Sequence, residues 1–176
     1  MSEYSDSVFK RYDEFLLEID KFINLRGQPV LDFGCGSGSG TVCLSLQDID
    51  IVGVDNNQPG DDCLKKAREY ALERKSKATF FCMDGENLSF PKESFGAVLA
   101  IDVFEHLSNP QKVLSEIKEV LNIGGFLVMV WQPYYAPYGG HLKSYSKNPW
   151  RQLMPFFNKE RFLRSACKKN PISAYE

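Results

Sequence analysis

Apolar residues along the chain follow two patterns, helical spacing and short continuous runs. Helical spacing begins with a stripe that predicts a first helix, formed by Val8, Phe9, Tyr12, Phe15, Leu16, Ile19, Phe22 and Ile23. Gly27 and Pro29 should end this helix. Five apolar runs predict strands at residues 29–33, 50–54, 78–82, 95–101 and 126–131.

Helical segments are predicted between these strands. A short helix is expected at residues 41–47, and another should run from Asp61 or Asp62 to about Lys75. Asn109 and Pro110 mark the start of a further helix. This helix should end at Gly124 and Gly125. Its buried side should be formed by Val113, Leu114, Ile117, Val120 and Leu121.

This alternation predicts an α/β fold in which a parallel sheet has helices on both faces. Because crossovers between parallel strands are right-handed, we expect a doubly wound, Rossmann-like sheet with the strand order 3-2-1-4-5. Ligands of such sheets bind beyond the carboxyl ends of the strands, where the strand order reverses. The functional residues should therefore lie between the exits of the first and fourth strands.

Length and composition indicate an ordinary globular protein. The 176 residues suit one domain, which we divide into an N-terminal helix at 1–28, a core at 29–131 and a C-terminal segment at 132–176. The longest apolar run, residues 126–131, is shorter than the ~20 residues of a membrane span. No basic segment followed by an apolar run opens the chain, so we expect no signal peptide.

Cysteines and charges add two expectations. The five cysteines are odd in number and include no Cys-x-x-Cys pair, which favours reduced thiols in a cytoplasmic protein.

Residues 141–176 carry 8 basic and 2 acidic groups, whereas residues 1–140 carry 13 basic and 21 acidic groups. The basic segment could meet an acidic ligand or nucleic acid, or it could pack on the acidic body or be solvated.

The strongest chemical signal follows the first predicted strand, where the chain reads VLDFGCGSGSG. Gly34, Gly36 and Gly38 allow a tight turn and a close approach of a ligand to the backbone. The helix that follows offers free N–H groups to an anion. Asp55 ends the second strand, where a carboxylate can accept hydrogen bonds from both hydroxyls of a ribose.

The nicotinamide-binding fingerprint does not fit this loop. A pattern that starts at Gly34 meets Ser39 where its last small residue is required, and one that starts at Gly36 meets Thr41. Asp32 is also foreign to that pattern, and a Walker loop is absent.

The loop instead resembles the first motif of class I S-adenosylmethionine-dependent methyltransferases. Asp32 stands in the usual place, Asp55 resembles their ribose-binding acid, and Asp84 resembles the acid that meets the adenine amino group. The order and spacing of the motifs, over residues 29–131, are most similar to the small-molecule type 11 branch that includes quinone-biosynthesis enzymes. The resemblance implies cofactor contacts from Asp32, Gly34, Cys35, Gly36, Gly38, Asp55, Asn56, Asp84, Gly85 and Ile101.

The implied reaction transfers a methyl group from S-adenosylmethionine to a small-molecule acceptor by in-line displacement, leaving S-adenosylhomocysteine. The candidate catalytic residues are His106, His141 and Asp102. His106 could shape the pocket, act as a general base or bind a metal, since Asp102, Glu105 and His106 resemble a metal-binding signature of quinone-biosynthesis enzymes. We expect no metal, because the resemblance extends to many relatives that carry Glu-His here without a metal, where the pair caps the loop and shapes the pocket.

His141 and Asp102 each leave alternatives open. His141 lies in a segment rich in tyrosine and glycine, which could form a lid over the acceptor or a stiff connector. Asp102 could contact the cofactor or only hold the end of the fourth strand. The first helix is expected to pack on the core, although Tyr4 or Tyr12 could touch the cofactor.

The chain departs from the family pattern after the fifth strand. Only 45 residues follow Trp131, so we expect the C-terminal hairpin of the family to be missing or altered. An open edge at the fifth strand would favour a homodimer. The alternative functions are a cofactor-binding module without a complete acceptor site and a nucleic-acid methyltransferase. The basic, aromatic C-terminal segment suggests the latter, but no Asn/Asp-Pro-Pro-Tyr/Phe motif stands at the fourth strand.

Overall fold

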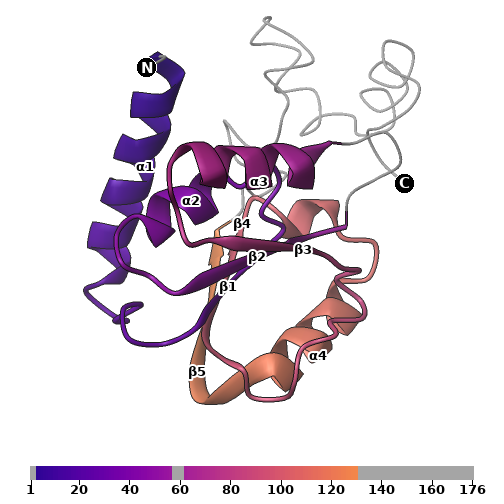
Figure 1. Ribbon diagram of the computed structural model, residues 1–176. Helices are drawn as coiled ribbons and strands as arrows, with labels where there is room; N and C mark the ends of the chain where they lie inside the picture. Colours follow the sequence, from indigo (N-terminus) through magenta and orange to yellow (C-terminus); the bar gives the residue numbers. More distant parts are fainter. Residues whose placement is uncertain (1–2, 57–61, 131–176) are drawn as a thin grey trace, which may run out of the picture. The chain divides into compact units, whose positions relative to one another are not determined.

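The computed structural model describes residues 3–56 and 62–130 (Figure 1). The chain divides into two units after Val130, and the described residues all belong to the first. Its helices are α1 (Glu3–Ile19), α2 (Ser39–Ser45), α3 (Cys63–Glu73), the 3-10 turn η1 (Phe104–His106) and α4 (Pro110–Val120). Its strands are β1 (Val30–Phe33), β2 (Ile51–Asp55), β3 (Thr79–Cys82), β4 (Phe95–Ile101) and β5 (Leu121–Val130).

The five strands form one parallel sheet in the order β3-β2-β1-β4-β5, which confirms the predicted fold class and strand order. In the central strand, Val30 lies opposite Ile51 of β2 and Ala97 of β4. Helices α1, α2 and α3 cover one face of the sheet and α4 covers the other (Figure 1). The predicted change in the C-terminal hairpin falls on residues 131–176, outside the described part, and the domain division stays a prediction.

Strand β4 is apolar along its whole length because both of its faces are covered. Ala97 and Leu99 pack with α1 and α2, whereas Val98 and Ala100 pack with α4. The burial of this strand fixes its register, because a shift by one residue would exchange the two faces. The exits of β1 and β4 are therefore held side by side.

Helix α4 begins as its sequence predicts. The side chain of Asn109 accepts a hydrogen bond from the backbone N–H of Lys112 at 3.2 Å, and Pro110 occupies the first turn. Val113, Ile117 and Val120 are buried against the sheet. Leu114 is 38% exposed, so its predicted place on the buried side is wrong.

Helix α1 ends earlier than the apolar stripe predicts. It stops at Ile19, and Arg26 pairs with Asp20 at 2.8 Å and donates to the Gln47 carbonyl, which holds the turn after the helix. This turn brings Leu25 into the core but leaves Phe22 80% exposed. The predicted place of Phe22 in the packed stripe is therefore wrong.

The end of α4 also differs from the prediction. Leu121 is already extended and pairs with Phe95, so α4 stops at Val120 rather than at the glycine pair. Gly124 and Gly125 lie in an irregular part of β5, where the pairing shifts before Phe126 meets Ala97. The regular pairing thus begins where the predicted strand begins.

Among residues 3–56 and 62–130, none of the helices combines the length and the apolar character that a membrane span requires.

Strand β4 offers a direct test of this packing. Leu99→Ala should lower the free energy of unfolding by about 2–5 kcal/mol, because it leaves a cavity at a fully buried position. Leu72→Ala, at a position that is 79% exposed, should change it by less than about 0.5 kcal/mol. Urea denaturation of both variants measures the difference. Equal losses would contradict the placement of β4 in the core.

Candidate functional site

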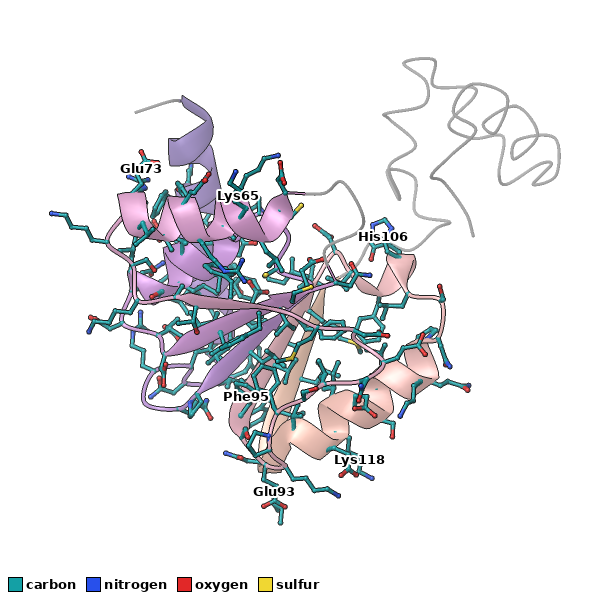
Figure 2. The ribbon with its side chains drawn as sticks, turned by 45° about the vertical axis from the view of Figure 1, so that its right-hand side comes forward. Lys65, Glu73, Glu93, Phe95, His106 and Lys118 are labelled. Carbon is teal, nitrogen blue, oxygen red and sulfur yellow. The ribbon has the colours of Figure 1, made fainter. Side chains whose placement is uncertain are left out.

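A cleft of about 390 Å³ opens at the carboxyl ends of β1, β2, β3 and β4. Figure 2 shows His106 at this end of the sheet, away from Phe95 and Glu93 at the opposite end. The cleft thus lies where the strand order reverses, as the fold class predicts. Its lining includes seven of the predicted site residues, namely Gly34, Asp55, Asn56, Asp84, Gly85, Asp102 and His106.

A larger hollow of about 520 Å³ lies beside α4 and the irregular start of β5. Lys92, Glu119 and Ile123 are among its walls, and Lys92 and Glu119 are already paired with each other at 2.5 Å. This hollow does not lie at the carboxyl ends of the strands. The smaller cleft is therefore the candidate functional site.

The Asp55 carboxylate ties the exit of β2 to the glycine loop. One oxygen accepts the backbone N–H of Gly36 at 2.8 Å, and the other accepts the N–H of Asn56 at 2.8 Å. The N–H groups of Gly34 and Cys35 bond the carbonyl of Val54, which fixes the loop further. An ionised carboxylate has about four lone-pair sites, so Asp55 can still accept hydrogen bonds from a ligand.

Gly34 forms part of the cleft wall in a backbone conformation that suits glycine. Its φ is +75°, and a Cβ at this position would clash with the methyl groups of Val103. Gly34 and Val103 therefore bring the exits of β1 and β4 into direct contact.

Asp32 holds the structure beneath the loop instead of lining the cleft. It is buried and accepts a hydrogen bond from the Thr41 hydroxyl of α2 at 2.6 Å. Burial raises the pKa of Asp32 to about 6, the Thr41 bond opposes this rise, and the nearby Asp55 adds to it. Asp32 thus anchors the start of α2, a role that the resemblance did not imply.

Four more of the predicted site residues lie outside the cleft lining: Cys35, Gly36, Gly38 and Ile101. Gly36 contributes its N–H to Asp55, and Gly38 is buried beneath Ala67 and Phe80. Burial raises the pKa of the Cys35 thiol, and Asp32 and Asp55 raise it further, so this thiol stays protonated.

Tyr12 packs close to the start of α2 rather than in the cleft lining. A Cβ on Gly40 would meet the phenol of Tyr12. Burial raises the pKa of Tyr12 to about 12, and the carboxylate of Asp32 contributes to the rise. The side chain of Tyr4 and all of His141 lie outside the part of the chain whose side chains are described.

The exit of β3 supplies a second carboxylate to the cleft. One oxygen of Asp84 accepts the backbone N–H of Glu86 at 2.9 Å. This bond orients the side chain and leaves the other oxygen for a ligand. Gly85 packs so closely on the Phe33 ring that a Cβ would clash with it.

The exit of β4 turns sharply at Asp102, whose φ is +54°. The Asp102 N–H donates to the Val130 carbonyl at 2.7 Å, and its carboxylate lies 3.5 Å from Arg11 of α1. His106 then enters the cleft lining, whereas Glu105 does not. In the described residues, no three histidine, cysteine or acidic side chains are grouped as metal ligands would be.

Several lining residues were missed by the sequence analysis: Phe33, Val54, Met83, Glu86, Val103, Leu107, Ser108 and Val113. Their positions next to predicted residues were the available signal, since Met83 and Glu86 flank the pair Asp84 and Gly85. Together the lining carries four carboxylates, from Asp55, Asp84, Glu86 and Asp102, and no lysine or arginine. Such a cleft favours a cationic ligand.

Comparisons with known proteins agree with this geometry. A family model described as a methyltransferase domain, of type 11, matches residues 31–129. The ubiquinone biosynthesis O-methyltransferase of Coxiella burnetii is 27% identical over 109 residues, covering 62% of this chain and 45% of that protein. A sterol 24-C-methyltransferase of Aspergillus fumigatus is 37% identical over 110 residues, covering 60% of this chain and 28% of that protein.

A solved structure extends the similarity. A protein from Pyrococcus horikoshii matches with a TM-score of 0.67 at 30% identity, over 83% of this chain and 66% of that one. The chain spans less than half the length of the two curated relatives.

The buried Asp32 predicts a pH dependence of stability. Because its pKa is raised from 3.8 to about 6 in the folded state, folding favours its protonated form. Its contribution is complete below about pH 4 and is lost as the pH rises through 6. Relative to Asp32→Asn, the wild type should lose about 2–2.5 kcal/mol of unfolding free energy between pH 4 and pH 7.

Urea denaturation at a series of pH values measures this difference. The control is Asp50→Asn, which changes an exposed aspartate and should follow the wild-type curve. If the difference between the wild type and Asp32→Asn is the same at every pH, Asp32 does not titrate in this range.

Proposed function

Because the chain belongs to the class I S-adenosylmethionine-dependent methyltransferases of type 11, we propose that it methylates a small-molecule acceptor and releases S-adenosylhomocysteine. The observation that supports this most strongly is the position of Asp55. Its carboxylate ends β2, lines the cleft and is locked beside the glycine turn by two backbone N–H groups. This is the place where a ribose-binding acid is needed.

The cleft residues fit the parts of the cofactor. Asp55 would accept the ribose hydroxyls, and the oxygen of Asp84 not bonded to Glu86 would accept the adenine amino group. Met83, Leu107 and Val113 supply apolar surface for a planar ring. The backbone of Gly34, which lines the cleft, would lie along the amino-acid end.

When bound, S-adenosylmethionine supplies a methyl carbon on a sulfonium, so the leaving group is already good. The protein's main task is then alignment, which can contribute about 7–11 kcal/mol to lowering a barrier. The four carboxylates of the cleft would attract the positive charge of the sulfonium. Residues around the β4 exit would orient the acceptor.

His106 and Ser108 are polar residues of the β4 exit that line the cleft. We assign His106 the role of shaping that end of the cleft, and the predicted role of His141 falls outside the described residues. The names of the two curated relatives indicate an oxygen acceptor in one and a carbon acceptor in the other. The proposal therefore specifies a small molecule and no particular acceptor atom.

We also propose a cytoplasmic homodimer. The described residues place no strand on the outer edge of β5, and its residues Phe126, Met129 and Val130 are 46%, 37% and 42% exposed. Such an edge can pair with a second chain. Sedimentation of the full chain should give a dimer, and a strict monomer at high concentration would contradict this assembly.

Substitution of Asp55 tests the proposed function. Asp55→Asn should weaken the binding of S-adenosylhomocysteine about 10–100-fold, because charged hydrogen bonds to the ribose and to the loop are lost. Asp50 directly precedes β2, at the end away from Asp55, and Asp50→Asn should bind within about twofold of the wild type. Titration calorimetry measures both affinities. Normal binding by Asp55→Asn would contradict the assigned role.

A further inference from the structure

Asp102 stands out among the cleft residues because of its backbone. With φ at +54°, it occupies the left-handed region, which is unfavourable for residues with a Cβ and least so for asparagine and aspartate. The other non-glycine residues with positive φ in the described ranges are Asp48, Lys75 and Glu93, and none of them lines the cleft.

The bend at Asp102 determines where the next residues lie. The Asp102 N–H is fixed to the Val130 carbonyl of β5 at 2.7 Å. Directly after the bend, the methyl groups of Val103 meet the backbone of Gly34. The Val103 carbonyl then accepts the N–H of His106 at 2.9 Å, which closes the turn that carries His106 into the cleft.

The carboxylate of Asp102 makes only a weak interaction with its neighbours. Its partner, Arg11, lies at 3.5 Å, and the two side chains are 41% and 64% exposed. Ion pairs between such exposed groups contribute little, because water and salt screen them. The positions of Val103 and His106 therefore depend on the backbone conformation of Asp102 and not on its carboxylate.

Building on the proposed function, we propose that Asp102 is a positioning residue: its left-handed backbone sets Val103 against Gly34 and His106 in the cleft. Aspartate serves here because it tolerates this conformation better than most residues with a side chain. The alternative is that its carboxylate itself contacts the cofactor. These two roles respond differently to substitution.

Three variants separate the two roles. Asp102→Asn and Asp102→Gly both tolerate the left-handed backbone but lack the charge. Asp102→Thr keeps a polar side chain of similar size, but its branched Cβ disfavours this backbone. The threonine variant should bind S-adenosylhomocysteine at least about fivefold more weakly than the asparagine and glycine variants.

Asp48→Thr is the matched control, because Asp48 has a similar φ of +62° and lies outside the cleft. It should lower the thermal midpoint as Asp102→Thr does, while its affinity for S-adenosylhomocysteine stays at the wild-type value. The control therefore distinguishes a loss of affinity caused by general destabilisation from one caused by strain at the cleft.

His106 supplies a spectroscopic readout of position. The chain has only two histidines, so His141→Gln identifies the imidazole signal of His106 in an NMR spectrum. In the ligand-free protein, the asparagine and glycine variants should keep the wild-type His106 signal, and the threonine variant should shift it.

The outcomes that would overturn the proposal are distinct. If all three Asp102 variants lose affinity equally, the carboxylate is the functional group. If the threonine variant matches the glycine variant in affinity and in its His106 signal, the bend is not required. If the wild type fails to bind S-adenosylhomocysteine, the proposed function is wrong, while the ligand-free His106 signals still test the positioning role.

Discussion

The parallel pairing of β1 with β2 on one side and with β4 on the other is the constraint on which the rest of the structure depends. After β1 the chain continues into α2 on one face of the sheet, and after β4 it continues into α4 on the other face, so a cleft opens at this edge. This arrangement brings Asp55, Asp84 and His106 to one edge of the sheet, although long segments separate them in sequence. The cleft is thus a consequence of strand order, and its chemistry depends on which residues occupy the strand ends.

Two aspartates of the same sequence region have different roles because their surroundings differ. Asp32 lies beneath the loop, where burial raises its pKa and a hydroxyl of α2 satisfies one oxygen. Asp55 lies at the cleft and accepts two backbone N–H groups, so its charge faces a ligand site. The sequence motif predicts a cofactor contact for both residues. The difference in burial shows that Asp32 anchors the loop, whereas Asp55 lines the ligand site.

Much of the fold could be predicted, because β4 is apolar throughout and Asn109 with Pro110 marks a helix start locally. The exposure of Phe22 could not be predicted, since the end of α1 depends on contacts made by Arg26 with distant residues. In the site, Asp55 was predictable from its place at a strand end. The bend at Asp102 was not, because no local pattern encodes a positive φ at a residue whose N–H is held by the distant strand β5.

A crystal structure of the chain with S-adenosylhomocysteine would show whether the cleft holds the cofactor and Asp55 its ribose. We expect the ligand in the cleft at the exits of β1 and β4, with both ribose hydroxyls about 2.7 Å from the Asp55 carboxylate. The adenine amino group should lie at Asp84. A ligand bound elsewhere, or a ribose that makes no contact with Asp55, would contradict the account.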